Sequence, residues 1–163
     1  MAINGIHHVA LSTQDIERSL EFYRDLLGAK IVFDGGWPQG TELADTVTRL
    51  TDSSCRQIML RIGNAYMEIF QYATPTPAPV NPARPVCDQG WTHLCLDVTD
   101  VDAEYQRMLA AGVDTHSEPQ RVADGVKTLY VRDPDGNVLE MQEVFPNTQS
   151  DALIGIPSFT PKA

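Results

Sequence analysis

The chain has 163 residues, of which 42% are hydrophobic, and a formal net charge of −10. This length suits one domain or two small modules that share a core, and the scattered lysines and arginines of an acidic chain argue against a nucleic-acid partner. No apolar stretch approaches the roughly 20 residues that span a bilayer. The first residues lack the basic and apolar segments of a secretion signal, so we expect a cytoplasmic protein that does not bind membranes.

The N-terminal half begins with an alternating strand at His8. Asp15 follows at the position of a helix N-cap, and Gly28 is typical of the residue that ends an amphipathic helix. A short strand is expected at 30–33. The polar segment 34–54 comes next, and loops of this length are often lids or binding loops.

A predicted hairpin closes this half, with strands at 56–62 and 65–72 on either side of a Gly63-Asn64 turn. The segment that follows contains five prolines within twelve residues. Proline stiffens the backbone and removes hydrogen-bond donors, so we interpret residues 74–90 as an extended linker. This linker divides the sequence near its middle into two halves that look alike.

The C-terminal half repeats the same order of elements. His93 lies 85 residues after His8 at the start of a second alternating strand, and Asp100 repeats the helix cap at the same offset. Gly112 ends the second predicted helix, and a short strand is expected at 114–117. The recurrence of strand, cap, helix and glycine at nearly constant spacing indicates an internal duplication.

A second hairpin, with strands at 126–132 and 137–144, follows around an Asp-Pro-Asp-Gly turn, in which proline presets φ and glycine accepts a positive φ. The pattern β-α-β-β-β therefore occurs twice. The sequence predicts an α+β fold in which two tandem βαβββ modules form a curved, cup-like mixed sheet with helices outside. The expected divisions are a first module at 1–73, the linker at 74–90, a second module at 91–145 and a tail at 146–163.

Strand parity places one histidine and one glutamate of each half on the face opposite the helices. Alternate side chains of a strand share a face, so His8 and His93 point away from the apolar faces that meet the helices. Glu68 and Glu140, 72 residues apart, hold equivalent positions in the last strand of each half. A buried carboxylate needs compensation, which a divalent cation supplies. We therefore expect one divalent metal ion bound by His8, Glu68, His93 and Glu140, with zinc, nickel, cobalt, manganese and iron not distinguished.

Aromatic side chains accompany these four positions, and they are either core residues or the wall of a substrate site. If they line the site, the substrate is a small molecule with an apolar or aromatic body and adjacent oxygens. The residues expected to contact it are Trp37, Tyr66, Phe70, Tyr72 and Tyr130, with Trp91 as a further candidate. Two other histidines lack a counterpart in the repeat, so we interpret His7 as structural and His116 as a surface residue.

Four segments carry a resemblance to a known family: HHVALSTQDIERSLEFYRDLLG, YMEIFQY, WTHLCLDV and YVRDPDGNVLEMQE. They resemble the vicinal oxygen chelate superfamily, which includes glyoxalase I, methylmalonyl-CoA epimerase, extradiol dioxygenases and the fosfomycin- and bleomycin-resistance proteins. The resemblance implies paired βαβββ modules around a metal ion, whose ligands map onto His8, Glu68, His93 and Glu140. It also implies a homodimer, since this arrangement is frequent in the family.

The ligand set is similar to those of glyoxalase I and methylmalonyl-CoA epimerase. Bacterial glyoxalase I, however, has an arginine where this chain has Ser12 and an asparagine where it has Tyr72, and both differences argue against a glutathione adduct. Methylmalonyl-CoA epimerase commonly has glutamine at the position of Glu68. The resemblance therefore implies a metal-dependent lyase or epimerase without naming its substrate.

The expected reaction is abstraction of a proton next to a carbonyl, with Glu140 or Glu68 as the base and the metal stabilising the enolate. An extradiol ring-cleaving dioxygenase is the first alternative. Tyr130 to Glu140 fits half of its signature, but residues 121–123 hold no histidine, and a fourth ligand at Glu68 would occupy a position that oxygen or catechol needs. A resistance-type protein that binds a small molecule without catalysis is the second alternative.

Overall fold

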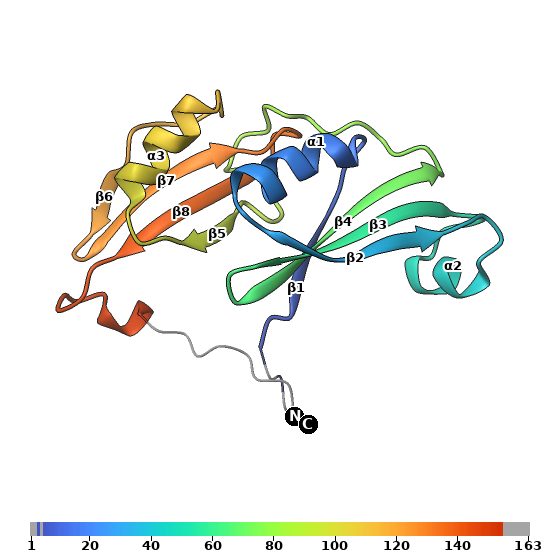
Figure 1. Cartoon of the computed structure of the whole chain (residues 1–163), viewed down its shortest axis with the longest axis horizontal. Coiled ribbons are helices and arrows are strands. Elements are labelled where there is room, and N and C mark those ends of the chain that lie inside the picture. Colours follow the sequence, from blue (N-terminus) through green and yellow to red (C-terminus); the bar gives the residue numbers. More distant parts are fainter. Residues whose placement is uncertain (1–2, 4, 155–163) are drawn as a thin grey trace. The chain divides into compact units, whose positions relative to one another are not determined.

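The computed structural model describes residue 3 and residues 5–154, and the chain divides into two compact units (Figure 1). The first unit extends to Pro79 and the second begins at Val80. Each unit contains a four-stranded mixed sheet with the same order of pairing, so the expected α+β fold with two tandem βαβββ modules is confirmed. The two units are described separately below.

The sheet of the first unit has the strand order β1-β4-β3-β2, with β1 parallel to β4 and the other pairs antiparallel. Ile58, Leu60 and Ile69 are fully buried on one face of this sheet. The opposite face is left to polar and aromatic side chains, because neighbouring residues of a strand point to opposite sides. The elements of this unit are β1 (His8–Ser12), α1 (Ile16–Leu20), a π-helical continuation η1 (Glu21–Leu26), β2 (Lys30–Trp37), α2 (Glu42–Thr48), β3 (Ser54–Ile62) and β4 (Ala65–Thr74).

Two hydrogen bonds fix the start of α1 against the sheet. The Asp15 side chain accepts a hydrogen bond from the backbone N–H of Arg18 at 3.1 Å, which confirms the predicted N-cap. The backbone N–H of Ile16 donates to Oε1 of Gln71 in β4 at 3.0 Å. The helix thus covers the apolar face, with Leu20 almost completely buried, and the other face stays open.

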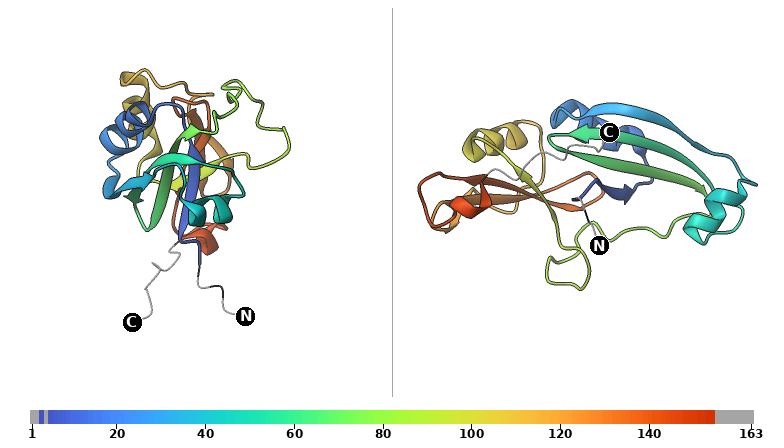
Figure 2. Two further views of the ribbon diagram at one scale, coloured as in Figure 1. Left: turned by 90° about the vertical axis from the view of Figure 1, so that its right-hand side faces the viewer. Right: turned by 90° about the horizontal axis from the view of Figure 1, so that it is seen from below.

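The second unit repeats this sheet in the order β5-β8-β7-β6, again with one parallel pair, β5 with β8. Leu129, Leu139 and Met141 are buried on the face that meets the helix α3, which contributes Val101 and Met108 (Figure 2). The elements of this unit are β5 (Leu94–Asp97), α3 (Val101–Ala110), β6 (Gln120–Ala123), β7 (Val126–Arg132) and β8 (Val138–Val144).

The start of α3 repeats the device seen at α1. The Asp100 side chain accepts a hydrogen bond from the N–H of Ala103 at 2.9 Å, and the N–H of Val101 donates to Oε2 of Glu143 in β8 at 3.1 Å. Asp100 corresponds to the first N-cap at an offset of 85 residues, and Glu143 corresponds to Gln71 at an offset of 72. The duplication therefore extends to the bonds that hold each helix on its sheet.

Two expectations about local structure are wrong. Segment 34–54 is not a single loop, because β2 continues to Trp37 and α2 fills the middle; the carboxylate of Asp45 closes this helix by accepting from the N–H groups of Asp52 and Ser53. The strand expected at 114–117 is only an isolated bridge at Thr115. The second strand of that unit is β6 instead, because it forms a tight hairpin with β7.

The tail beyond β8 contains a short 3-10 helix, η2 (Asp151–Leu153). The N–H of Gln149 donates to the Asp124 carboxylate at 3.1 Å, which ties this part of the tail to the turn between β6 and β7. Residues 155–163 of the expected tail lie outside the described residues. Within the part of the chain that the structure describes, no helix is both long enough and apolar enough to cross a membrane.

Candidate functional site

A histidine and a glutamate meet on the open face of the first unit. His8 is the first residue of β1, and the pairing of Ala10 with Glu68 places the glutamate beside it on the same face. The distance from His8 Nε2 to Glu68 Oε2 is 3.3 Å. The glutamate side chain is only 14% exposed although it lies opposite the apolar core. The parity argument for these two residues thus agrees with the geometry of the unit.

The second unit contains the same pair. His93 immediately precedes β5, and Cys95, two residues further on, pairs with Glu140 in β8. The distance from His93 Nε2 to Glu140 Oε2 is 3.0 Å, and the Glu140 side chain is 13% exposed. Each unit therefore supplies one imidazole and one carboxylate in nearly identical contact.

The second oxygen of each glutamate accepts a hydrogen bond from the neighbouring strand. Gln57 Nε2 in β3 donates to Glu68 Oε1 at 2.6 Å, and Thr128 Oγ1 in β7 donates to Glu140 Oε1 at 2.7 Å. Gln57 pairs with Phe70, and Thr128 pairs with the residue 72 positions later in the chain, so the two donors occupy equivalent places. Each carboxylate is thus held through one oxygen while the other faces the imidazole.

The second nitrogen of each imidazole is engaged by the preceding residue. Nδ1 of His8 lies 2.9 Å from Nδ1 of His7, and Nδ1 of His93 lies 3.0 Å from Oγ1 of Thr92. Hydrogen bonds at Nδ1 fix the ring orientation and leave Nε2 as the nitrogen that faces the carboxylate. Such outer contacts are characteristic of histidines that bind metals through Nε2.

The open face of each unit also carries a cysteine and a tyrosine whose ionisation is disfavoured. Burial, followed by the negative charge of Glu140, raises the pKa of Cys95 to about 12. Burial alone raises the pKa of Cys55 to about 11. The pKa values of Tyr72 and Tyr130 are also raised, first by burial and then by nearby groups that include the glutamate of the same unit. These four groups therefore stay neutral near pH 7 and act as packing or hydrogen-bonding groups.

Aromatic rings extend the open face of the first unit. The Trp37 ring lies edge-on to those of Phe70 and Tyr72, with centroids 6.1 and 5.8 Å away, and its Nε1 donates to Ser53 Oγ at 3.0 Å. Tyr66, expected in the same group, stacks on His7 instead at 5.0 Å. Three of the aromatic residues predicted to contact a substrate thus form one cluster.

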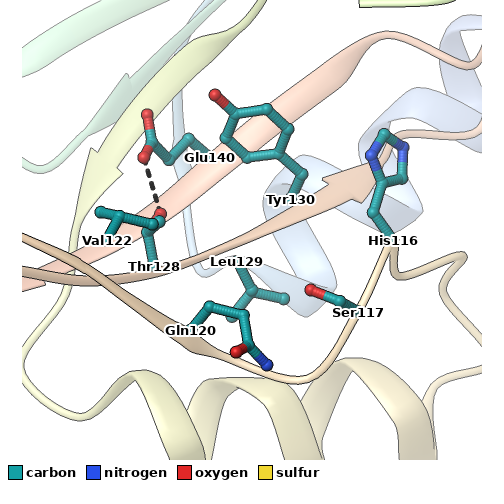
Figure 3. A pocket seen from close by; sticks show the side chains of 8 residues that line it. All are labelled: His116, Ser117, Gln120, Val122, Thr128, Leu129, Tyr130 and Glu140. Atoms are coloured by element: carbon teal, nitrogen blue, oxygen red, sulfur yellow. Dashed lines mark hydrogen bonds between the residues drawn. The ribbon is translucent and has the colours of Figure 1, made fainter.

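A pocket of about 380 Å³ opens on the same face of the second unit (Figure 3). Glu140 and Tyr130 lie side by side in it, and His116 lies beyond the tyrosine ring at a centroid distance of 6.0 Å. Tyr130 also contacts the ring of His93 at 5.0 Å. The pocket is lined by His116, Ser117, Gln120, Val122, Thr128, Leu129, Tyr130 and Glu140.

The sequence argument missed part of this pocket. It placed His116 on the surface because the repeat offers no second histidine there, yet this side chain lines the pocket of Glu140. Gln120 was missed because the strand was expected at 114–117, whereas the pairing of Gln120 with Thr128 would have revealed it. Trp91 differs in the opposite way: it was a candidate for substrate contact, and it is 94% exposed.

No cluster of three or more histidine, cysteine, aspartate or glutamate side chains suited to a metal ion is found among the described residues. Each unit instead contributes two such groups, one histidine and one glutamate. Joint binding by His8, Glu68, His93 and Glu140 therefore stays a prediction.

Comparison with known proteins identifies the family. The family model of the glyoxalase/bleomycin resistance protein/dioxygenase superfamily matches residues 5–141. A 2-epi-5-epi-valiolone epimerase from an Actinomyces species is 30% identical over 84% of this chain and 78% of its own. A lactoylglutathione lyase from Pseudomonas putida is 27% identical over 86% of this chain and 85% of its own.

A glyoxalase family protein from Bacillus cereus has a similar solved structure, with a TM-score of 0.80 and 17% identity over 89% of this chain and 97% of that one. At this identity the likeness concerns the fold alone. The family match spans both βαβββ modules and includes all four repeated histidine and glutamate positions. The chain therefore belongs to the glyoxalase/bleomycin resistance protein/dioxygenase superfamily.

Proposed function

We propose that this protein is a metal-dependent enzyme that moves a proton on the carbon next to a carbonyl group of a small molecule. The observation that carries this proposal is the repeated pair of imidazole and carboxylate, with the same outer hydrogen bonds in both units. A duplicated chain has no structural need to keep a histidine beside a half-buried glutamate twice. A shared ligand of both pairs supplies that need.

The chemistry of the four side chains fits a divalent cation. Imidazole nitrogen and carboxylate oxygen are ligands of zinc, nickel, cobalt, manganese and iron. Two donors about 2.1 Å from one ion and at right angles to each other lie roughly 3 Å apart. The nitrogen–oxygen distances of 3.3 and 3.0 Å match this separation. Ion pairs without a metal would have a similar spacing, so bound metal has to be measured directly.

The proposal assigns one ion to two pairs, His8 with Glu68 and His93 with Glu140. This predicts one ion per chain, whether the two pairs come from one chain or from the two chains of a homodimer. When bound, the ion supplies positive charge that polarises the carbonyl and makes the adjacent C–H more acidic.

Glu140 is the base that the geometry favours. It lines the pocket of the second unit, its Oε1 is held by Thr128, and its Oε2 points toward the imidazole of His93. A carboxylate fixed through one oxygen can accept a proton with the other without losing its orientation. Tyr130 stays protonated next to it and can donate a hydrogen bond to a substrate oxygen.

The relatives support two versions of this chemistry, epimerisation and a lyase reaction. One relative is named an epimerase and another a lyase. The family resemblance implies an arginine and an asparagine for a glutathione substrate, and this chain has Ser12 and Tyr72 there. We therefore place epimerisation of a hydroxy ketone before a glutathione-dependent lyase reaction.

The test is incorporation of solvent deuterium, followed by proton NMR in D₂O. The full-length protein is loaded with each of the five metals and incubated with three carbonyl compounds: scyllo-inosose, the hemithioacetal of methylglyoxal and glutathione, and methylmalonyl-CoA. We expect deuterium next to the carbonyl of at least one compound, and no incorporation after chelation of the metal. Oxygen consumption with a catechol, or tight binding of a compound without exchange, would instead favour the dioxygenase or the binding protein.

A further inference from the structure

We infer, building on the function proposed above, that the pocket of the second unit selects an uncharged carbonyl compound rich in hydroxyl groups. The pocket of about 380 Å³ lies toward the lower end of the roughly 300–1,000 Å³ usual for ligand sites. Glu140, the proposed base, forms part of its wall (Figure 3). A substrate that presents its reacting carbon to this carboxylate therefore places its other groups against the remaining lining residues.

Those residues offer hydrogen-bonding groups that suit hydroxyls. Gln120 Nε2 donates to the carbonyl of Glu118 at 3.1 Å, and Ser117 Oγ donates to the same carbonyl at 2.8 Å. After these bonds the amide keeps an N–H donor and a carbonyl acceptor, and the hydroxyl keeps its acceptor capacity. His116 adds an imidazole with both roles. A hydroxyl group is both donor and acceptor, so it matches this mixed lining.

Positive charge is absent from the wall of the pocket, since none of its eight lining residues is a lysine or an arginine. The two nearest cations in the sequence of β6 and β7 are engaged elsewhere. Lys127 Nζ binds the Asp102 carboxylate of α3, and the guanidinium of Arg121 lies 4.7 Å from the Phe145 ring centre. The pairing of Arg121 with Lys127 alternates with that of Gln120 and Thr128, so the cations belong to the other face of the sheet.

An anionic substrate group would therefore enter this pocket without a counter-charge and beside the carboxylate of Glu140. Removing a phosphate, phosphonate or carboxylate from water under these conditions is costly. The overall charge of −10 adds a long-range repulsion. A neutral polyol keeps its hydrogen bonds at no such cost, and the rings of Tyr130 and His116 give its C–H faces an apolar surface.

The test measures binding by isothermal titration calorimetry with the full-length, metal-loaded protein. The neutral probe is scyllo-inosose, a pentahydroxycyclohexanone, and the anionic probes are the hemithioacetal of methylglyoxal and glutathione, and methylmalonyl-CoA. We expect the neutral probe to bind more tightly than both anionic probes. Tighter binding of either anionic probe would overturn the inference.

A variant in the pocket assigns the binding to this site. Gln120→Leu removes the amide at nearly constant size and should weaken binding of scyllo-inosose about 3- to 10-fold, which corresponds to the loss of one or two neutral hydrogen bonds. The matched control is Gln106→Leu, the same change at an exposed position of α3, which should leave binding unchanged. Equal binding by wild type and Gln120→Leu would contradict the assignment.

Deuterium exchange separates this inference from the proposed function. Exchange on scyllo-inosose that falls in Gln120→Leu supports both. Exchange confined to an anionic compound would overturn the substrate class and keep the proton-transfer chemistry. Binding of scyllo-inosose that depends on Gln120, with no exchange on any compound, would keep the selectivity of the pocket and overturn the proposed reaction.

Discussion

The two units share their candidate metal ligands and differ in what surrounds them. In both units an imidazole contacts a glutamate whose other oxygen is held from the neighbouring strand. The first unit extends this face with the aromatic rings of Trp37, Phe70 and Tyr72. The second unit extends it with a polar pocket around Tyr130 and His116. Duplication thus preserved the half-site for the ion, while the residues that would meet a substrate diverged.

The largest expected effect tests whether the two glutamates differ in role. Glu140→Gln keeps the size of the side chain and removes the proposed base, so we expect deuterium exchange to fall at least about 100-fold. Bound metal is measured in the same samples, because amide oxygen is a weaker ligand. Glu143→Gln in the same strand is the matched control, and its exchange rate should stay close to that of wild type.

Equivalent core positions test whether the two units are equally stable. Ile58 in β3 pairs with Ile69, and Leu129 in β7 holds the corresponding place opposite Met141. Replacing either with alanine leaves a cavity, so each variant should lower the free energy of unfolding by about 2–5 kcal/mol. Urea denaturation followed by circular dichroism measures this loss. A change below about 1 kcal/mol in one variant would show that its unit has little packed core there.

The outer hydrogen bonds sharpen the comparison at the ion. Gln57→Leu and Thr128→Val each remove one donor to a glutamate oxygen and keep most of the side-chain volume. Both variants should weaken metal binding about 10- to 100-fold, measured by competition with a chelator. Equal effects would mean that the two half-sites contribute alike. An effect in only one variant would break the symmetry, and no effect in either would contradict the assigned role.

The smallest effects concern the helix caps. Asp15→Ala and Asp100→Ala each remove a side-chain oxygen that accepts a backbone hydrogen bond at the start of a helix. Each should cost about 1 kcal/mol of stability in thermal or urea denaturation. Asparagine caps helices as well as aspartate does, so Asp15→Asn and Asp100→Asn should be close to neutral. Equal losses in alanine and asparagine variants would point to charge rather than to capping.

The duplicated architecture was predictable from the sequence because it leaves a periodic record. The recurrence of His8 at His93 and of Glu68 at Glu140 fixed the register of the strands that carry them. Strand parity then placed each pair on the face opposite the helix, as the structure has it. The helix caps at Asp15 and Asp100 were predictable for the same reason, since capping depends on local sequence.

The parts that could not be predicted depend on contacts between distant residues. Segment 34–54 contains α2 and an extended β2, because Asp45 binds the N–H groups that follow this helix. The position of β6, and with it Gln120 in the pocket, follows from its hairpin with β7 rather than from its own alternation. His116 gave no periodic signal, so only its packing beside Tyr130 revealed it.

Metal stoichiometry tests the central claim most directly. Wild-type protein is purified, loaded with each candidate metal, dialysed and analysed by mass spectrometry, alongside His8→Ala, His93→Ala and Glu68→Gln. His116→Ala is the control, because this imidazole lines the pocket and is not assigned to the ion. We predict one ion per chain in wild type and in the control, and a clear loss in the other three variants. Two ions per chain, no bound ion, or full retention in Glu68→Gln would contradict a single ion held by both pairs.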